Sequence, residues 1–84
     1  MPAGVAEQAD QVWDNIAAIL AEADMATTDL VAMTTYVVAG VELPPVMAAR
    51  DRRLGGHLVA STLVTVPALA RPEWLVEIAV IAAT

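Results

Sequence analysis

One acidic residue, Glu77, interrupts an apolar run near the end of the sequence and is the first candidate for chemistry. The run spans residues 75–83, is rich in β-branched side chains, and predicts a strand buried on at least one face. Alternate residues of a strand point the same way, so Glu77 shares its face with Leu75, Ala79 and Ile81. A carboxylate among apolar neighbours is solvated at an edge, paired, or held in place for chemistry. The pattern by itself favours an edge or interface carboxylate.

Ser61, His57 and Glu77 have the residue types of a nucleophilic triad, but their spacing argues against one. Residues 57 and 61 lie about 13 Å apart along an extended chain, so their side chains cannot bond directly. The chain has one histidine and no cysteine, and its carboxylates do not cluster at ligand spacing, which disfavours a zinc site. No phosphate-binding loop, nucleophile elbow or calcium-loop motif occurs. We therefore expect neither a metal nor a triad, and His57 is expected to be a partly exposed loop residue.

The charge pattern disfavours nucleic acid and anionic lipid as partners. The net charge is −6, with ten acidic residues against four arginines and no lysine. Three of the arginines, Arg50, Arg52 and Arg53, surround Asp51 and form one local basic spot. We interpret this spot as a solvated helix end whose arginines lie near the negative end of the helix dipole.

Length and composition predict one small domain that needs a partner. A chain of 84 residues buries only roughly 60–65% of the surface that its unfolded form exposes, so its core is marginal. Disulfides are excluded without cysteine, yet 58% of the residues are hydrophobic, and oligomerisation would hide the excess apolar surface. No segment predicts a transmembrane helix or a signal peptide, so the expected location is cytoplasmic.

Hydrophobic periodicity predicts an α+β domain with the order α-β-α-β-β. Helices are expected at residues 6–23 and 45–54, and strands at 30–38, 58–66 and 75–83. The helix between the first two strands predicts a right-handed parallel crossover. Residues 67–74 are too few for a crossover helix, which predicts that the last two strands are antiparallel neighbours. Both helices are expected to stack on one face of the sheet.

An ordered set of segments resembles the C-terminal two-thirds of the Rid family (RidA/YjgF-like, also described as L-PSP translation inhibitors). The segments are residues 12–20 (VWDNIAAIL), 30–37 (LVAMTTYV), Gly56, 60–64 (ASTLV) and 69–78 (LARPEWLVEI). Their order and spacing cover about residues 8–83, and the ending that contains Glu77 is the most specific part.

This resemblance implies a chorismate-mutase-like fold with two helices on one face of a mixed sheet, and a homotrimer with ligand clefts between subunits. Active members hydrolyse reactive enamines and imines to keto acids and ammonia without a metal or an organic cofactor. Glu77 matches the glutamate that positions and polarises the attacking water. Ser61 and Tyr36 are the candidate substrate-binding residues, although Tyr36 by itself is expected to be a core or interface aromatic.

The chain departs from the family pattern in two places. Ser61 stands where the family has an arginine that holds the substrate carboxylate, and losing such a bidentate pair costs about 2–4 kcal/mol in transition-state binding. Arg50, Arg52 or Arg53 would have to supply a replacement. The N-terminal strands of the family also have no counterpart, so we interpret residues 1–84 as one N-terminally short domain with an exposed sheet edge.

Two functional hypotheses follow from these features. The first is an imine or enamine hydrolase in which Glu77 positions water and Ser61 contacts the ligand. The second is a non-catalytic ligand-binding or structural oligomer of the same family, suggested by Ser61 and by the short N-terminus. RNA cleavage, which only the older family description supports, is disfavoured by the net charge.

Overall fold

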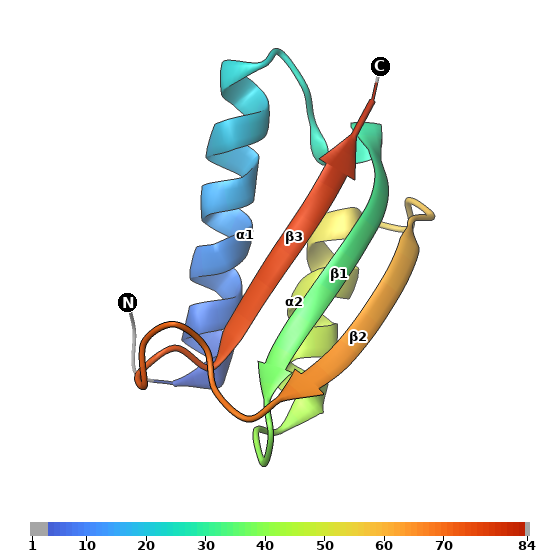
Figure 1. Cartoon of the computed structure of the whole chain (residues 1–84). Coiled ribbons are helices and arrows are strands. Elements are labelled where there is room, and N and C mark those ends of the chain that lie inside the picture. Colours follow the sequence, from blue (N-terminus) through green and yellow to red (C-terminus); the bar gives the residue numbers. More distant parts are fainter. Residues whose placement is uncertain (1–3, 84) are drawn as a thin grey trace.

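The computed structural model describes residues 4–83 as a three-stranded sheet with two α-helices packed on it (Figure 1). In chain order the elements are α1 (Val5–Glu22), the short 3-10 helix η1 (Thr27–Asp29), β1 (Leu30–Val38), α2 (Leu43–Leu54), β2 (Ala60–Val66) and β3 (Val76–Ala82). The predicted α-β-α-β-β order and the α+β class are confirmed. Each predicted helix or strand overlaps an observed one, and the ends differ by at most two residues.

The α1 helix forms because its apolar residues recur at helical spacing and line one buried face. Ala9, Trp13, Ile16 and Leu20 are all buried against the sheet and the second helix. The chain leaves the helix through Asp24, which has a φ of 56° and so takes the left-handed conformation that is common just after a helix end. This turn directs the chain back toward β1.

The α2 helix is bounded by residues that favour a start and a stop. Prolines 44 and 45 occupy its first turn, where a missing backbone N–H costs nothing. Gly55 ends the helix with a φ of 56°, and its N–H donates to the carbonyl oxygen of Asp51 at 3.1 Å. Val46 and Ala49 form its buried face.

The strand order is β2-β1-β3, which corrects one prediction. β1 and β2 pair in parallel, as the helical crossover predicted. β3 pairs antiparallel with β1 rather than with β2, so the last two strands run in opposite directions but are not neighbours. The predicted connection, residues 67–74, is too short to contain a crossover helix. When extended, however, its eight residues reach about 26–29 Å. This is well beyond the ~10 Å between two strands that lie on either side of a third. The chain therefore crosses the end of β1 (Figure 1).

A buried glutamine attaches that crossing segment to the helix layer. Gln8 of α1 is fully buried, its Nε2 donates to the carbonyl oxygen of Glu73 at 2.8 Å, and its Oε1 accepts the backbone N–H of Leu75 at 2.8 Å. Both bonds satisfy backbone groups immediately before β3. The start of β3 is thus held beside α1 and on the far side of β1 from β2.

The two faces of the sheet differ because both helices pack on the same one. Met33, Thr35 and Val37 of β1 are buried beneath the helices, while the alternate residues are only half-buried. The face away from the helices is called the open face here. Its residues, taken from the strand register, are Ala32, Thr34, Tyr36 and Val38 of β1, Ala60, Thr62, Val64 and Val66 of β2, and Glu77, Ala79 and Ile81 of β3. No helix within residues 4–83 is long and apolar enough to cross a membrane.

Candidate functional site

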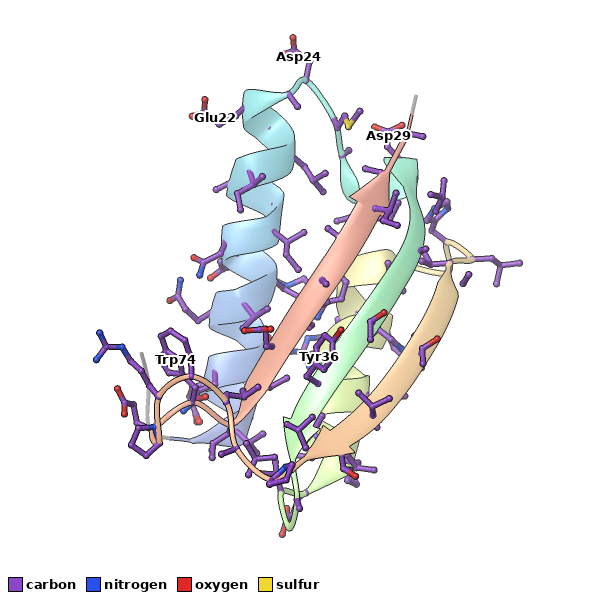
Figure 2. All side chains as sticks on the ribbon, in the orientation of Figure 1. Glu22, Asp24, Asp29, Tyr36 and Trp74 are labelled. Carbon is purple, nitrogen blue, oxygen red and sulfur yellow. The ribbon has the colours of Figure 1, made fainter. Side chains whose placement is uncertain are left out.

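Glu77 is the one charged residue of the open face. It lies in β3 directly beside Tyr36 of β1, and Tyr36 in turn lies beside Val64 of β2. Its neighbours along β3 on this face are Ala79 and Ile81, as predicted, and Ile81 is 63% exposed. Figure 2 shows Tyr36 at the middle of the sheet. The structure therefore brings together two of the three predicted site residues, Glu77 and Tyr36.

A groove of about 290 Å³ runs between β3 and α1 and includes Glu77 in its lining. Asn15 and Trp74 are the other residues of the lining that carry polar atoms, and the remainder is aliphatic. The full lining is Val12, Asn15, Ile16, Ile19, Trp74, Val76, Glu77 and Ile78. Glu77 thus lies where the open face meets an apolar groove with a few polar groups, the usual composition of a small-molecule site. A carboxylate in this position can bind a water molecule and accept its proton.

Ser61 lies on the opposite face of the sheet from Glu77. Its register partner in β1 is Met33, whose side chain is buried beneath the helices. Ser61 itself is exposed because β2 is an edge strand that α2 covers only in part. The two residues are therefore separated both by β1 and by the thickness of the sheet. A single small ligand cannot contact Ser61 and Glu77 of the same chain.

Ser61 belongs to a second cavity, of about 360 Å³, between the end of α2 and the start of β2. We call it the α2–β2 pocket. Its lining residues are Arg50, Asp51, Leu54, Gly56, His57, Leu58, Val59 and Ser61. The Nε2 atom of His57 is 2.9 Å from the carbonyl oxygen of Leu30 and so donates to it. A Ser61–His57–Glu77 triad is excluded within one chain, because Glu77 lies on the other face.

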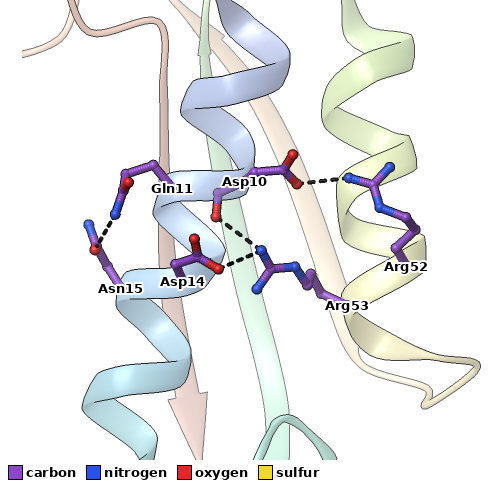
Figure 3. Close-up of polar contacts among 6 residues, drawn as sticks. All are labelled: Asp10, Gln11, Asp14, Asn15, Arg52 and Arg53. Atoms are coloured by element: carbon purple, nitrogen blue, oxygen red, sulfur yellow. Dashed lines mark hydrogen bonds and ion pairs between the residues drawn. The ribbon is translucent and has the colours of Figure 1, made fainter. Parts of the chain in front are cut away.

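The three arginines predicted to form a basic spot at the end of α2 have two different kinds of partner. Arg52 donates to a carboxylate oxygen of Asp10 at 2.8 Å, and Arg53 donates to Asp14 at 2.6 Å and to the carbonyl oxygen of Asp10 at 3.3 Å (Figure 3). These pairs connect α2 to α1. Arg50 instead pairs with its neighbour Asp51 at 2.9 Å and lines the α2–β2 pocket.

Several residues of functional interest carry no signal in the sequence pattern. Gln8 occupies a position that periodicity alone would not single out, and only the crossing segment at Glu73 and Leu75 explains its burial. Nothing in the sequence pattern distinguishes Arg50 from Arg52 and Arg53. Only the structure shows that Arg50 lines the α2–β2 pocket while the other two pair with α1. Within residues 4–83, no group of three or more histidine, aspartate or glutamate side chains is arranged to hold a metal ion.

The fold and the site together define a chorismate-mutase-like α+β protein, with two helices on one face of a mixed sheet and a carboxylate on the other. The family model described as Endoribonuclease L-PSP matches residues 1–84. The protein therefore belongs to this family, whose members also carry the names YjgF and Rid. The resemblance predicted from the sequence is confirmed. No curated protein matches the sequence.

Solved structures from several bacteria share this fold along nearly the whole chain. A protein of the YjgF/YER057c/UK114 family from Mycobacterium tuberculosis superposes with a TM-score of 0.90 at 24% identity, over 100% of this chain and 71% of its own. A YjgF-family protein from Neisseria meningitidis gives 0.90 at 28% identity, over 98% and 69%. A Rid-family protein of unknown function from Yersinia pestis gives 0.88 at 30% identity, over 100% and 65%. This chain thus spans roughly two-thirds of the length of each.

Proposed function

We propose that this protein is an oligomeric hydrolase of small imines or enamines, in which Glu77 activates the attacking water. The observation that carries the proposal is the placement of Glu77 as the single charge on an otherwise apolar and hydroxyl-bearing face, at the rim of a groove. Glu77 is exposed, so its carboxylate is available to a bound water molecule at the rim of the groove. The proposed class of reaction is suggested by the family to which the chain belongs.

The reaction needs only a general base and a position for the substrate. Glu77 accepts a proton from water while the water oxygen attacks the carbon of the protonated C=N bond, which forms a carbinolamine. Proton transfer to its nitrogen then allows the C–N bond to break, so that one imine and one water give one carbonyl compound and one ammonia. No electron transfer occurs, and this balance requires no further reactant. A positioned general base contributes about 10²–10⁴-fold in rate.

The proposed cleft lies between subunits, as in the homotrimer that the family resemblance implies. The open face has no covering layer among residues 4–83, and it exposes Ile81 and Val64. Because Ser61 and Glu77 cannot meet within one chain, a ligand that used both would lie between Glu77 of one subunit and Ser61 of another. Association would also bury apolar surface that a domain of this size cannot cover by itself.

The alternative from a different class is a non-catalytic oligomer that binds a small ligand. The observation that favours it is Ser61, because a serine hydroxyl cannot form the two charge-assisted bonds of an arginine with a carboxylate. RNA cleavage receives less support. The net charge is −6, and the open face carries no basic residue.

The test measures the decay of 2-iminobutanoate with the purified protein and with two matched variants. We expect the wild-type chain to accelerate the decay, and Glu77→Gln to lower this acceleration by about 10²-fold or more, because the amide cannot accept the proton. Glu73→Gln is the control, since Glu73 is an exposed glutamate in the segment before β3. Equal rates for Glu77→Gln and wild type would contradict the role of Glu77. A wild-type rate equal to that of buffer would favour the non-catalytic alternative.

A further inference from the structure

The outer side of β3 presents a row of backbone groups that no other strand of residues 4–83 pairs with. β3 is at the edge of the sheet, and β1 is its one neighbour among these residues. The carbonyl oxygen of Leu75 accepts the N–H of Val38, and the N–H of Ala83 donates to the carbonyl oxygen of Asp29, both at 3.0 Å. Backbone groups alternate in direction along a strand, so the odd-numbered residues between them also point toward β1. The outward N–H and C=O groups belong to Val76, Ile78, Val80 and Ala82.

The residues of β3 do little to protect this edge. Natural edge strands are usually short, or carry lysine or proline, which discourages pairing with another chain. β3 has seven residues, Val76–Ala82, without lysine or proline, and Glu77 is its only polar residue. An apolar strand with an open backbone ladder is a template for another extended chain.

The groove between α1 and β3 lies directly beside this edge. Figure 1 shows α1 on the side of β3 that faces away from β1. The groove wall from α1 consists of Val12, Asn15, Ile16 and Ile19, and Ile19 is 70% exposed. In a strand added antiparallel to β3, the residues that pair with Ile78 and its even-numbered neighbours would carry their side chains on the helix side. Those side chains would enter a mostly apolar groove, so they would have to be apolar.

The position of α1 disfavours a second copy of β3 as the occupant. Antiparallel pairing of two β3 strands would make one continuous sheet with all the helices on the same face. The two β3 strands would lie about 4.8 Å apart. Each α1 stands over the outer side of its own β3 (Figure 1), so the two helices would come closer than the roughly 8–10 Å that packed helices require. A single extended segment without its own helix layer avoids this clash.

We propose that the β3 edge and the adjoining groove bind an extended peptide segment of another protein, antiparallel to β3. Its backbone would pair with the outward groups of β3, and the antiparallel ladder is the more stable arrangement per residue. Alternate side chains would be apolar and fill the groove. The remaining side chains would lie on the open face, where a basic residue beside Glu77 gives an opposite-charge pair. The proposal does not depend on imine hydrolysis.

The experiment titrates isotopically labelled full-length protein with a synthetic nine-residue peptide and follows the backbone amides by NMR. Threonine and valine alternate in this peptide, and lysine replaces the central threonine. In the free protein, we expect the amides of residues 77, 79 and 81 to be protected from hydrogen exchange and those of residues 78, 80 and 82 to exchange quickly. The peptide should cause saturable shifts in β3 and slow the exchange of the second set. Protection of both sets without peptide, or no saturable shifts, would overturn the proposal.

Two N-methylated peptides form a matched pair of controls. In the antiparallel arrangement the valine N–H groups point to β3 and the threonine N–H groups point away from it. N-methylation of the valines should therefore weaken binding at least about tenfold, whereas N-methylation of the threonines should weaken it far less. Equal binding by the two peptides would mean that no backbone ladder forms and would overturn the proposal.

A variant of the groove tests the same site from the side of the protein. Ile19→Glu should weaken binding at least about tenfold, because it places a charge in the apolar groove, and it should fold because Ile19 is exposed. Ala18→Glu is the matched control, since it adds the same charge at an exposed position of α1 outside the groove. Equal weakening by the two variants would contradict binding in the groove.

The proposed charge pair is tested by exchanging the peptide lysine for threonine. This change should weaken binding to the wild-type protein about two- to fivefold, as expected for an exposed ion pair. It should make no difference to binding by Glu77→Gln, which already lacks the carboxylate. The same loss with both proteins would overturn the proposed pairing with Glu77.

Discussion

Ser61 and Glu77 lie on opposite faces of the sheet, with β1 between their strands. Ser61 is in register with the buried Met33, whereas Glu77 is in register with Tyr36 on the open face. The family resemblance places both residues at one ligand, and the single chain cannot do so. A ligand that contacted both residues would therefore have to lie between two copies of the chain.

Restoring a guanidinium at position 61 should strengthen carboxylate recognition. Ser61 is exposed and lines the α2–β2 pocket, so Ser61→Arg has room and should change the free energy of unfolding by no more than about 0.5 kcal/mol. We expect kcat/KM for 2-iminobutanoate to rise about tenfold or more, as a charge-assisted pair would give. Ser61→Lys, which adds charge without the planar fork, is the control and should gain less. An unchanged kcat/KM in a folded Ser61→Arg variant would contradict this expectation.

Removing the buried amide of Gln8 should destabilise the start of β3. Gln8→Leu leaves the carbonyl oxygen of Glu73 and the N–H of Leu75 without these bonds, at a cost of about 2–4 kcal/mol for two buried groups. Urea unfolding measures the change. Gln11→Leu is the matched control, since its bond to Asn15 is exposed and should matter by less than about 0.5 kcal/mol. Equal stability of the two variants would show that the crossing segment does not depend on Gln8.

Charge on the open face should break the assembly. Ile81 belongs to this face and is 63% exposed, so Ile81→Lys would place an unpaired ammonium in the proposed contact between subunits. We expect light scattering at micromolar concentration to give an oligomeric mass for the wild type and a smaller mass for Ile81→Lys. Leu58→Lys is the control: Leu58 is 91% exposed, but it lies in the loop between α2 and β2 and not on the open face. A wild-type monomer of 8.8 kDa would contradict the proposed cleft.

The turn after α2 should tolerate poorly any residue with a side chain. Gly55 has a φ of 56°, and a Cβ there would meet no atom within 4 Å, so the cost of Gly55→Ala is a backbone cost of about 1 kcal/mol. Such a change lowers the melting temperature of a domain of this size by roughly 4–8 °C. Gly55→Asn is the comparison, because asparagine adopts the left-handed conformation more readily and should lose less. A melting temperature unaffected by Gly55→Ala would argue against this helix end.

Local patterns predicted the helices and strands closely. Apolar spacing predicted α1 to within one residue at each end and α2 to within two residues at its start. The parallel pairing of β1 with β2 followed from the intervening helix. The position of β3 did not follow, because the length of residues 67–75 limits how far the chain can reach but not on which side of β1 it lands. In the structure, two long-range hydrogen bonds join Gln8 to that segment on the side of β1 where β3 lies.

The sequence by itself determined the family, the element order, and the placement of Glu77 on one strand face with Ala79 and Ile81, because each of these depends on short-range spacing or on segment order. Only the tertiary structure decided which residues share a face and which arginine reaches a cavity. Alternation along one strand cannot relate Ser61 on β2 to Glu77 on β3, since their relation depends on how both strands register with β1. Likewise, Arg50, Arg52 and Arg53 are close in sequence, but the carboxylates of α1 engage two of them and leave Arg50 beside Ser61.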